Sequence, residues 1–209
     1  DDVAVDSTGN RVFLGTQNGY VVAVDVERRT VLASAKLHEG AVLGVTCVPT
    51  ADTVVTCGRD GRIVELRGPD FASPRTIVAT GSAISSITLD GDDLLCSERN
   101  ALCRRDRRTG EILLSRPCPN WFNSMVVLGD DRLVTGSDDG RVGFWDRREL
   151  ELMLELKQPA RAAWRLAADS RARWLAVSCF GGDPRVLYAE SATSGAFDVQ
   201  QARARVAAA

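Results

Sequence analysis

The chain of 209 residues contains few side chains whose types and spacing could perform chemistry. His38 is its one histidine, so a site that needs two imidazole groups is excluded. The six cysteines include no Cys-x-x-Cys pair, the spacing found in zinc ribbons and thioredoxin-like redox sites. Glycine-rich phosphate loops and the Gly-x-Ser-x-Gly nucleophile elbow are also absent. We therefore expect a protein that is not an enzyme and that uses no metal or organic cofactor.

The cysteines and the acidic pairs favour structural roles. Cys47, Cys57 and Cys96 lie in apolar segments, where cysteine is typically a small buried hydrophobic residue. Free cysteines indicate a reducing compartment, so we expect a cytoplasmic or nuclear protein. The pairs Asp130-Asp131 and Asp138-Asp139 fall at predicted turns, where aspartate is common, and are interpreted as turn residues rather than metal ligands.

The composition is that of a globular protein. Hydrophobic residues make up 44% of the chain and charged residues 26%, close to the average of folded domains. The 26 basic and 28 acidic residues give a net charge of −2, which excludes a strongly basic nucleic-acid-binding domain. Every basic residue except Lys36 and Lys157 is an arginine. No apolar run reaches about 18 residues, so no membrane-spanning helix is expected.

A β-hairpin pattern recurs along the chain. Leu133–Asp146 reads LVTGSDDGRVGFWD, two apolar runs joined by a tight Asp-Asp-Gly turn. Related hairpins span Val12–Asp25, Val54–Arg67, Leu94–Asp106 and Trp174–Glu190. The slot of Trp145 recurs at Val24, Leu66, Arg105 and Ala189, in steps of 39 to 44 residues. A period near 40 residues with two central strands is typical of a four-stranded propeller blade.

Further apolar segments supply an outer strand on each side of every hairpin. The segments before the hairpins are Val3–Val5, Val42–Val48, Ala83–Leu89, Met125–Leu128 and Ala163–Ala167. Those after them are Val31–Lys36, Arg75–Ala79, Ile112–Arg116, Leu150–Leu156 and Ala196–Gln200. We expect an all-β propeller of four-stranded antiparallel blades over residues 1–201. Its five blades would span 1–37, 38–80, 81–118, 119–158 and 159–201, followed by a C-terminal tail, 202–209.

The repeats resemble the WD-repeat family of β-propellers. The fourth repeat carries the clearest match in Gly136, Ser137, Asp139, Gly140, Trp145 and Asp146, and the second matches through His38, Thr56, Asp60 and Gly61. The resemblance implies a buried relay in which a turn Asp bonds a His, the His bonds a Ser or Thr, and that residue bonds a Trp. The structural residues expected from it are His38, Thr56, Asp60, Gly61, Thr135, Asp139, Gly140, Trp145 and Asp146.

No repeat contains the whole relay. The second has Leu66 in the Trp slot, and the fourth has no His. Most propellers of the family have seven blades, so five repeats and a first residue other than Met indicate an incomplete ring or a fragment of a larger one.

Three surface features are candidates for binding a partner. Arginines gather after two third strands, at Arg104, Arg105, Arg107, Arg108, Arg147 and Arg148. They could contact an acidic protein or an RNA backbone. Trp121 and Phe122 either pack beneath the fourth repeat, the favoured interpretation, or anchor an interface. The run from Trp145 to Arg148 resembles a box in substrate receptors of cullin-type ubiquitin ligases, in which the Arg contacts the adaptor protein.

The function expected from these observations is that of a non-catalytic scaffold for protein–protein contacts in a larger multiprotein assembly. The alternatives are a ubiquitin-ligase substrate receptor and an RNA-contacting subunit of a ribonucleoprotein complex. No membrane and no small-molecule substrate is expected as a partner.

Overall fold

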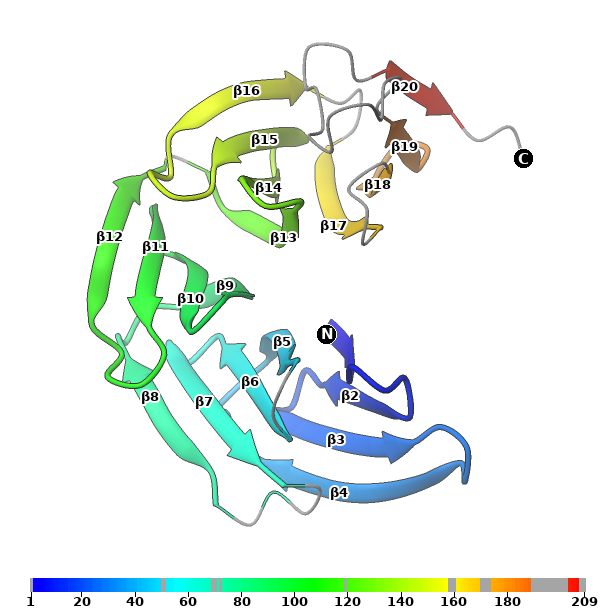
Figure 1. Cartoon of the computed structure of the whole chain (residues 1–209), viewed down its shortest axis with the longest axis vertical. Coiled ribbons are helices and arrows are strands. Elements are labelled where there is room, and N and C mark those ends of the chain that lie inside the picture. The colour runs from blue at the N-terminus through cyan, green and yellow to red at the C-terminus, as the bar shows by residue number, and fades with distance from the viewer. Residues whose placement is uncertain are drawn as a thin grey trace. The chain divides into compact units, whose positions relative to one another are not determined.

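The computed structural model describes residues 2–49, 52–68, 71, 73–118, 120–157, 161–169, 174–188 and 203–206. All regular structure in these residues is β-strand. The described part of the chain contains no helix that could cross a membrane. The strands form five sheets, and each sheet contains four strands that are consecutive in the chain and pair in chain order (Figure 1). The expected all-β fold of four-stranded antiparallel sheets is confirmed.

The five sheets are numbered along the chain. Sheet 1 contains β1 (Asp2–Val5), β2 (Arg11–Gly15), β3 (Tyr20–Asp25) and β4 (Thr30–Lys36). Sheet 2 contains β5 (Val42–Val48), β6 (Thr53–Gly58), β7 (Arg62–Arg67) and β8 (Arg75–Ala79). Sheet 3 contains β9 (Ile84–Asp90), β10 (Asp93–Glu98), β11 (Ala101–Asp106) and β12 (Ile112–Pro117). Sheet 4 contains β13 (Phe122–Leu128), β14 (Arg132–Ser137), β15 (Arg141–Asp146) and β16 (Leu152–Lys157). Sheet 5 contains β17 (Ala162–Ala168), β18 (Trp174–Phe180), β19 (Arg185–Tyr188) and β20 (Arg203–Val206).

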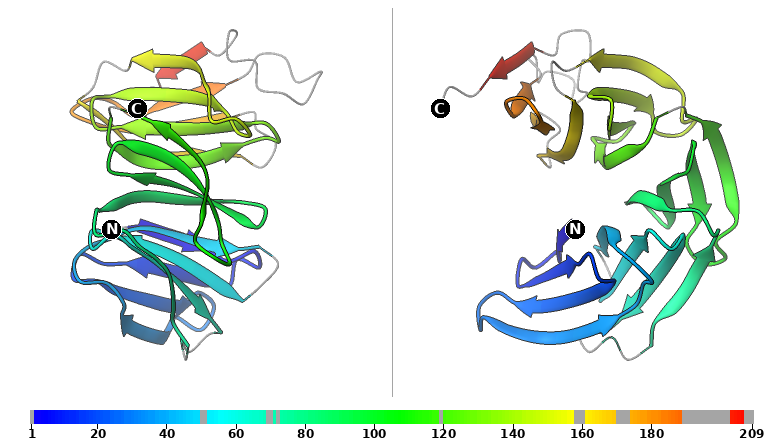
Figure 2. Two further views of the ribbon diagram at one scale, coloured as in Figure 1. Left: turned by 90° about the vertical axis from the view of Figure 1, so that its left-hand side faces the viewer. Right: turned by 180° about the vertical axis from the view of Figure 1, so that it is seen from behind.

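The chain forms two compact units, residues 1–113 and 114–209. Within each unit neighbouring sheets pack face to face (Figure 2). Apolar cores lie between these sheets. In the first unit Phe13 and Val21 of sheet 1 meet Val45 and Val54 of sheet 2. In the second unit the core between sheets 4 and 5 includes Phe144. Burial of these aliphatic and aromatic faces is the main force that holds neighbouring sheets together.

Two strand predictions differ from the structure. Residues 202–209 were expected to be a C-terminal tail. In the structure, residues 203–206 form β20, which pairs with β19 as the fourth strand of sheet 5. The predicted strand Ala196–Gln200 lies outside the described residues. In sheet 4 the first strand begins at Phe122 rather than Met125, so Phe122 belongs to the sheet and not to a loop.

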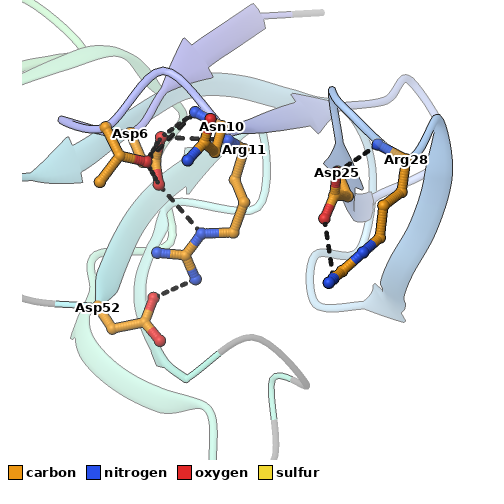
Figure 3. A network of polar contacts seen from close by, with 7 residues as sticks. Asp6, Asn10, Arg11, Asp25, Arg28 and Asp52 are labelled. Atoms are coloured by element: carbon orange, nitrogen blue, oxygen red, sulfur yellow. Dashed lines mark hydrogen bonds and ion pairs between the residues drawn. The ribbon is translucent and has the colours of Figure 1, made fainter.

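An aspartate organises the turn between the third and fourth strands in three sheets. Asp25 accepts a hydrogen bond from the Arg28 amide at 2.7 Å and pairs with the Arg28 guanidinium (Figure 3). Asp106 accepts from the Thr109 amide at 2.7 Å. Asp146 accepts from the Arg148 and Glu149 amides, and these bonds lower the pKa of its carboxyl. The Asp that follows the Trp slot is therefore a turn-capping residue.

The same turn places its last residue in the left-handed region. In sheet 3 this residue is Gly110, with φ of 79°, whereas Arg29 in sheet 1 has φ of 55° and Leu150 in sheet 4 has φ of 53°. A left-handed conformation costs roughly 1–2 kcal/mol for a residue with a Cβ atom. Leu150 is buried and gains packing there, but Arg29 is exposed.

We predict that Arg29→Gly stabilises the protein by about 0.5–1 kcal/mol, because it removes the left-handed strain and loses no packing. Urea unfolding followed by circular dichroism measures the change. Leu150→Gly is the matched comparison and is expected to destabilise, since it empties a buried site. An unchanged or lower midpoint for Arg29→Gly contradicts the prediction.

Candidate functional site

The candidate site is the set of buried polar side chains at the ends of the central hairpins. In sheet 2, His38 precedes β5 and is 1% exposed. Its Nδ1 atom lies 2.9 Å from Asp60 Oδ1, and its Nε2 atom lies 2.9 Å from Thr56 Oγ1. Thr56 also donates to the carbonyl of Val64 at 3.3 Å. The structure thus brings His38, Thr56 and Asp60 together, and the chain of bonds ends on the backbone.

Asp60 is the charged end of this chain of bonds. Burial raises the pKa of its carboxyl, but hydrogen bonds from His38 and from the Glu39 and Arg62 amides outweigh burial and leave the pKa below its usual value. An ionised carboxylate only accepts hydrogen bonds, so His38 donates through Nδ1. The neighbouring Gly61 has φ of 75°, the left-handed geometry that its tight turn requires. The imidazole of His38 and the hydroxyl of Thr56 are buried and hydrogen-bonded within the protein.

Gly58 makes the space that His38 occupies. A Cβ atom at this position would lie 2.5 Å from His38 Nδ1 and 2.9 Å from Asp60 Oδ1. Any larger residue would displace the imidazole ring. The residue that precedes the Asp60 turn is therefore as much a part of the relay as the polar side chains are.

Sheet 4 contains the other half of the relay. The indole Nε1 of Trp145 donates to Thr135 Oγ1 at 2.9 Å. A Cβ atom at Gly143 would lie 2.8 Å from that nitrogen and 2.9 Å from that oxygen. Gly143 therefore permits the Trp145–Thr135 bond. Sheet 2 has Val64 at this position, opposite Thr56. Phe122 packs edge-on against Trp145, with ring centroids 5.8 Å apart.

A serine replaces the histidine as the partner of the turn aspartate in sheet 4. Ser137 stands where sheet 2 has Gly58, and its hydroxyl lies 2.5 Å from Asp139 Oδ1. Asp139 also accepts from the Arg141 guanidinium at 2.7 Å. Although burial raises the pKa of Asp139, these bonds lower it overall. Gly140, with φ of 81°, completes the turn.

Cys118 stands at the position that His38 has in sheet 2. Both strands that follow carry a β-bulge at their start, between Val42 and Gly44 in β5 and between Phe122 and Ser124 in β13. His38 lies four residues before Val42, and Cys118 lies four residues before Phe122, so the two residues occupy equivalent positions. The relay of sheet 4 is therefore split into a Ser137–Asp139 bond and a Trp145–Thr135 bond.

The arginines expected on the surface are largely held by acidic residues. Arg105 is buried, and its guanidinium pairs with Glu98 at 2.5 and 2.8 Å, so its assignment to a partner-binding patch was wrong. Arg104 binds Asp90 at 2.7 Å and Asp93 at 3.1 Å. An arginine in the Trp slot, a position that is usually apolar, was a signal for such a buried ion pair.

Arg107 is also engaged inside the protein. It pairs with Glu65, a buried carboxylate of β7 that also binds Arg67 and Arg75. Glu65 was not among the residues expected to be functional, although an acid among apolar strand residues indicates a charge partner nearby. Arg108 is exposed.

In the second unit Arg148 is exposed, and Arg147 is half-buried with a bond to the Gly129 carbonyl at 3.3 Å. The two candidate interface anchors differ in exposure: Phe122 is buried and Trp121 is half-buried. Of these four residues, Arg148 has the side chain most accessible to a partner.

Sequence reasoning also missed an ion network beside sheet 1. Arg11 pairs with Asp6 at 3.1 Å and with Asp52, which lies between β5 and β6 of sheet 2 (Figure 3). Together with Cys47 these residues line a cavity of about 250 Å³. Burial raises the pKa of Cys47 to about 11, so its thiol stays protonated at neutral pH. In the described part of the chain no group of three or more His, Cys, Asp or Glu side chains could hold a metal ion.

We predict that Asp60→Asn destabilises the protein at pH 7 and that the difference disappears in acid. The folded-state pKa of Asp60 lies below its unfolded value, so its ionisation stabilises the fold above about pH 4 and ceases to do so as pH falls through the folded pKa. Thermal midpoints of both proteins, measured as pH is lowered, test this. A constant difference across the whole range contradicts it.

A second prediction concerns the split relay. Cys118→His alone is expected to destabilise, because Ser137 occupies the space that Gly58 leaves for His38. Ser137→Gly alone loses the hydroxyl bond to Asp139. The double variant can form the whole relay, so we expect a favourable coupling of about 1–3 kcal/mol in a double-mutant cycle by urea unfolding. Simple additivity of the two single changes contradicts this prediction.

Comparison with known proteins yields matches of fold. No family model matches the chain, and no curated protein matches it. The β-propeller domain of Cps50 (Swd1) from Myceliophteria thermophila superposes with a TM-score of 0.77 at 15% identity, covering 98% of this chain and 70% of that one.

Two further solved structures, U3-55K and the WD40 repeats of RRP9, have TM-scores of 0.74 and 0.75 at 13% identity. Each match covers 89% of this chain and 61% of the other. The five meandering sheets, the capped turns and the halves of a relay agree with these matches: the chain has the fold of WD40 β-propeller blades.

Proposed function

We propose that the protein is a non-catalytic scaffold that binds other proteins, and that one contact surface is the outward face of sheet 5. The observation that carries this proposal is the group of three large aromatic side chains exposed on that face. Trp164, Trp174 and Phe180 are 51%, 47% and 63% exposed. Exposed aromatic groups of this size are unusual on a soluble domain and mark interaction sites.

The alternation of β18 separates its two faces. Leu175 and Val177 are buried against sheet 4, whereas Trp174 and Phe180 point to the opposite face. Trp164 of β17 lies beside Phe180, with ring centroids 6.4 Å apart. Trp164 and Phe180 thus form an aromatic pair, and Trp174 lies on the same face at the other end of β18.

The corresponding face of sheet 4 shows what such a surface binds. The β-bulges of β13 and β17 align the two sheets. In this alignment Ala176 of sheet 5 occupies the position that Val134 has in sheet 4. Val134 is fully buried, because it packs against Leu175 and Val177 of the next sheet. The exposed face of sheet 5 therefore fits the apolar face of another antiparallel sheet.

The partner inferred from this geometry is a protein that presents an aliphatic β-sheet face. Flat aromatic side chains bury large areas at little cost in conformational entropy, and a rigid sheet holds them in place before binding. The free cysteines agree with a reducing compartment, the cytoplasm or nucleus. RNA binding is less favoured, because Arg104, Arg105 and Arg107 are paired with acids. The ubiquitin-ligase alternative remains a prediction that rests on Arg148.

Site-specific photo-crosslinking tests the contact surface. A photoreactive residue at position 180 is expected to capture a protein partner in cells, and the same residue at the exposed Arg28 is not. Phe180→Asp combined with Trp164→Asp is expected to abolish capture from a nearby probe position, with the circular dichroism spectrum unchanged. Capture only of a second copy of this chain, or equal capture at both positions, contradicts the proposal.

A further inference from the structure

The split relay of sheet 4 leaves a cavity of about 230 Å³. Its apolar walls include Phe122, Trp145 and Leu152, and Cys118 and Thr135 line it as well. Asn120, Arg141 and Glu155 are among its other lining residues. In sheet 2 the corresponding region, between the turn aspartate and the threonine, is filled by the ring of His38.

A buried hydroxyl in this cavity has an unused hydrogen. Thr135 is fully buried and accepts a bond from Trp145 Nε1, which leaves its own hydroxyl hydrogen to be donated. Thr56 at the same position in sheet 2 contacts both His38 and the Val64 carbonyl. Among the described residues no acceptor takes the Thr135 hydrogen. A ligand that enters the cavity therefore gains a bond if it offers an acceptor there.

The size and shape of the cavity indicate a small flat ring. The rings of Phe122 and Trp145 meet at an interplanar angle of 74°, and both line the cavity. An apolar protein cavity of about 150 Å³ holds benzene, so the larger space here admits a five-membered ring. The hydroxyl of Ser137 and the carboxylate of Glu155 also border the space and can accept a hydrogen from such a ring.

We propose that the cavity of sheet 4 binds a small neutral azole of the imidazole class. One ring nitrogen accepts the hydroxyl hydrogen of Thr135, and the ring N–H donates toward Ser137 or Glu155. Because Ser137 occupies the space that Gly58 leaves for His38, the ligand ring lies beside Ser137 rather than in the position of the His38 ring. The same chemistry is available from free imidazole or from the side chain of a histidine-containing peptide.

Nuclear magnetic resonance of protein labelled with ¹⁵N-tryptophan tests the proposal. The four indole N–H resonances are followed while imidazole is added at about pH 8, where it is neutral. The Trp145 resonance, identified with Trp145→Phe, is expected to shift saturably while the other three stay in place. At about five times its dissociation constant, imidazole is expected to raise the thermal midpoint by about 2–4 °C.

Matched ligands and variants separate this site from non-specific binding. Pyrrole has the N–H but no acceptor nitrogen, and we expect it to bind at least about tenfold more weakly, the loss from one unpaired buried hydroxyl. Thr135→Val is expected to remove this preference and Thr135→Ser to retain it. The Cys118→His, Ser137→Gly double variant fills the cavity with its own imidazole and is expected to lose the response.

The outcomes are distinct. Shifts for imidazole and also for N-acetylhistidine amide assign a site that accepts a peptide side chain, whereas shifts for imidazole alone assign a small-molecule site. No shift of the Trp145 resonance, equal shifts of all four, or equal affinity for pyrrole overturns the proposal. None of these results depends on the aromatic face of sheet 5.

Discussion

The requirement that buried polar groups be hydrogen-bonded is the constraint on which the rest of the structure depends. The central hairpins of sheets 2 and 4 each carry a buried threonine on their first strands, Thr56 on β6 and Thr135 on β14. The partner of that hydroxyl differs between the two sheets, a histidine in one and an indole in the other. In both sheets the carboxylate of the turn aspartate, Asp60 or Asp139, is hydrogen-bonded. Two different sets of side chains thus hold the same backbone geometry.

A second device is the use of arginine inside the protein. Glu98 with Arg105, and Glu65 with its three arginines, place ion pairs where the repeat pattern favours apolar residues. The planar guanidinium forms two bonds to one carboxylate, which makes it better suited than lysine to such sites. Buried pairs of this kind add little net stability, but the loss of one partner leaves an uncompensated charge. Much of the arginine content therefore serves internal contacts rather than a basic surface.

The fold was predictable from the sequence because its signals are local and repeated. Tight Asp-Gly and Asn-Gly turns and alternating apolar runs located the hairpins, and the repeat period joined them into four-stranded sheets. The position of β20 was not predictable, because its four residues carry no distinctive apolar pattern. The pairing of Arg105 with Glu98 and the role of Ser137 depend on distances across a sheet, which residue types alone do not give. Likewise, the exposure of Trp164, Trp174 and Phe180 depends on how β17 and β18 are placed in the fold, which residue types alone do not give.

The two glycines that accommodate the relay have an evolutionary consequence. Gly58 is compatible with a histidine and Gly143 with a tryptophan, and a side chain at either position would collide with its partner. A change from one arrangement to the other therefore requires paired substitutions, each of which is harmful without the other. Such epistasis allows the repeats of this chain to differ in sequence while their backbones stay alike.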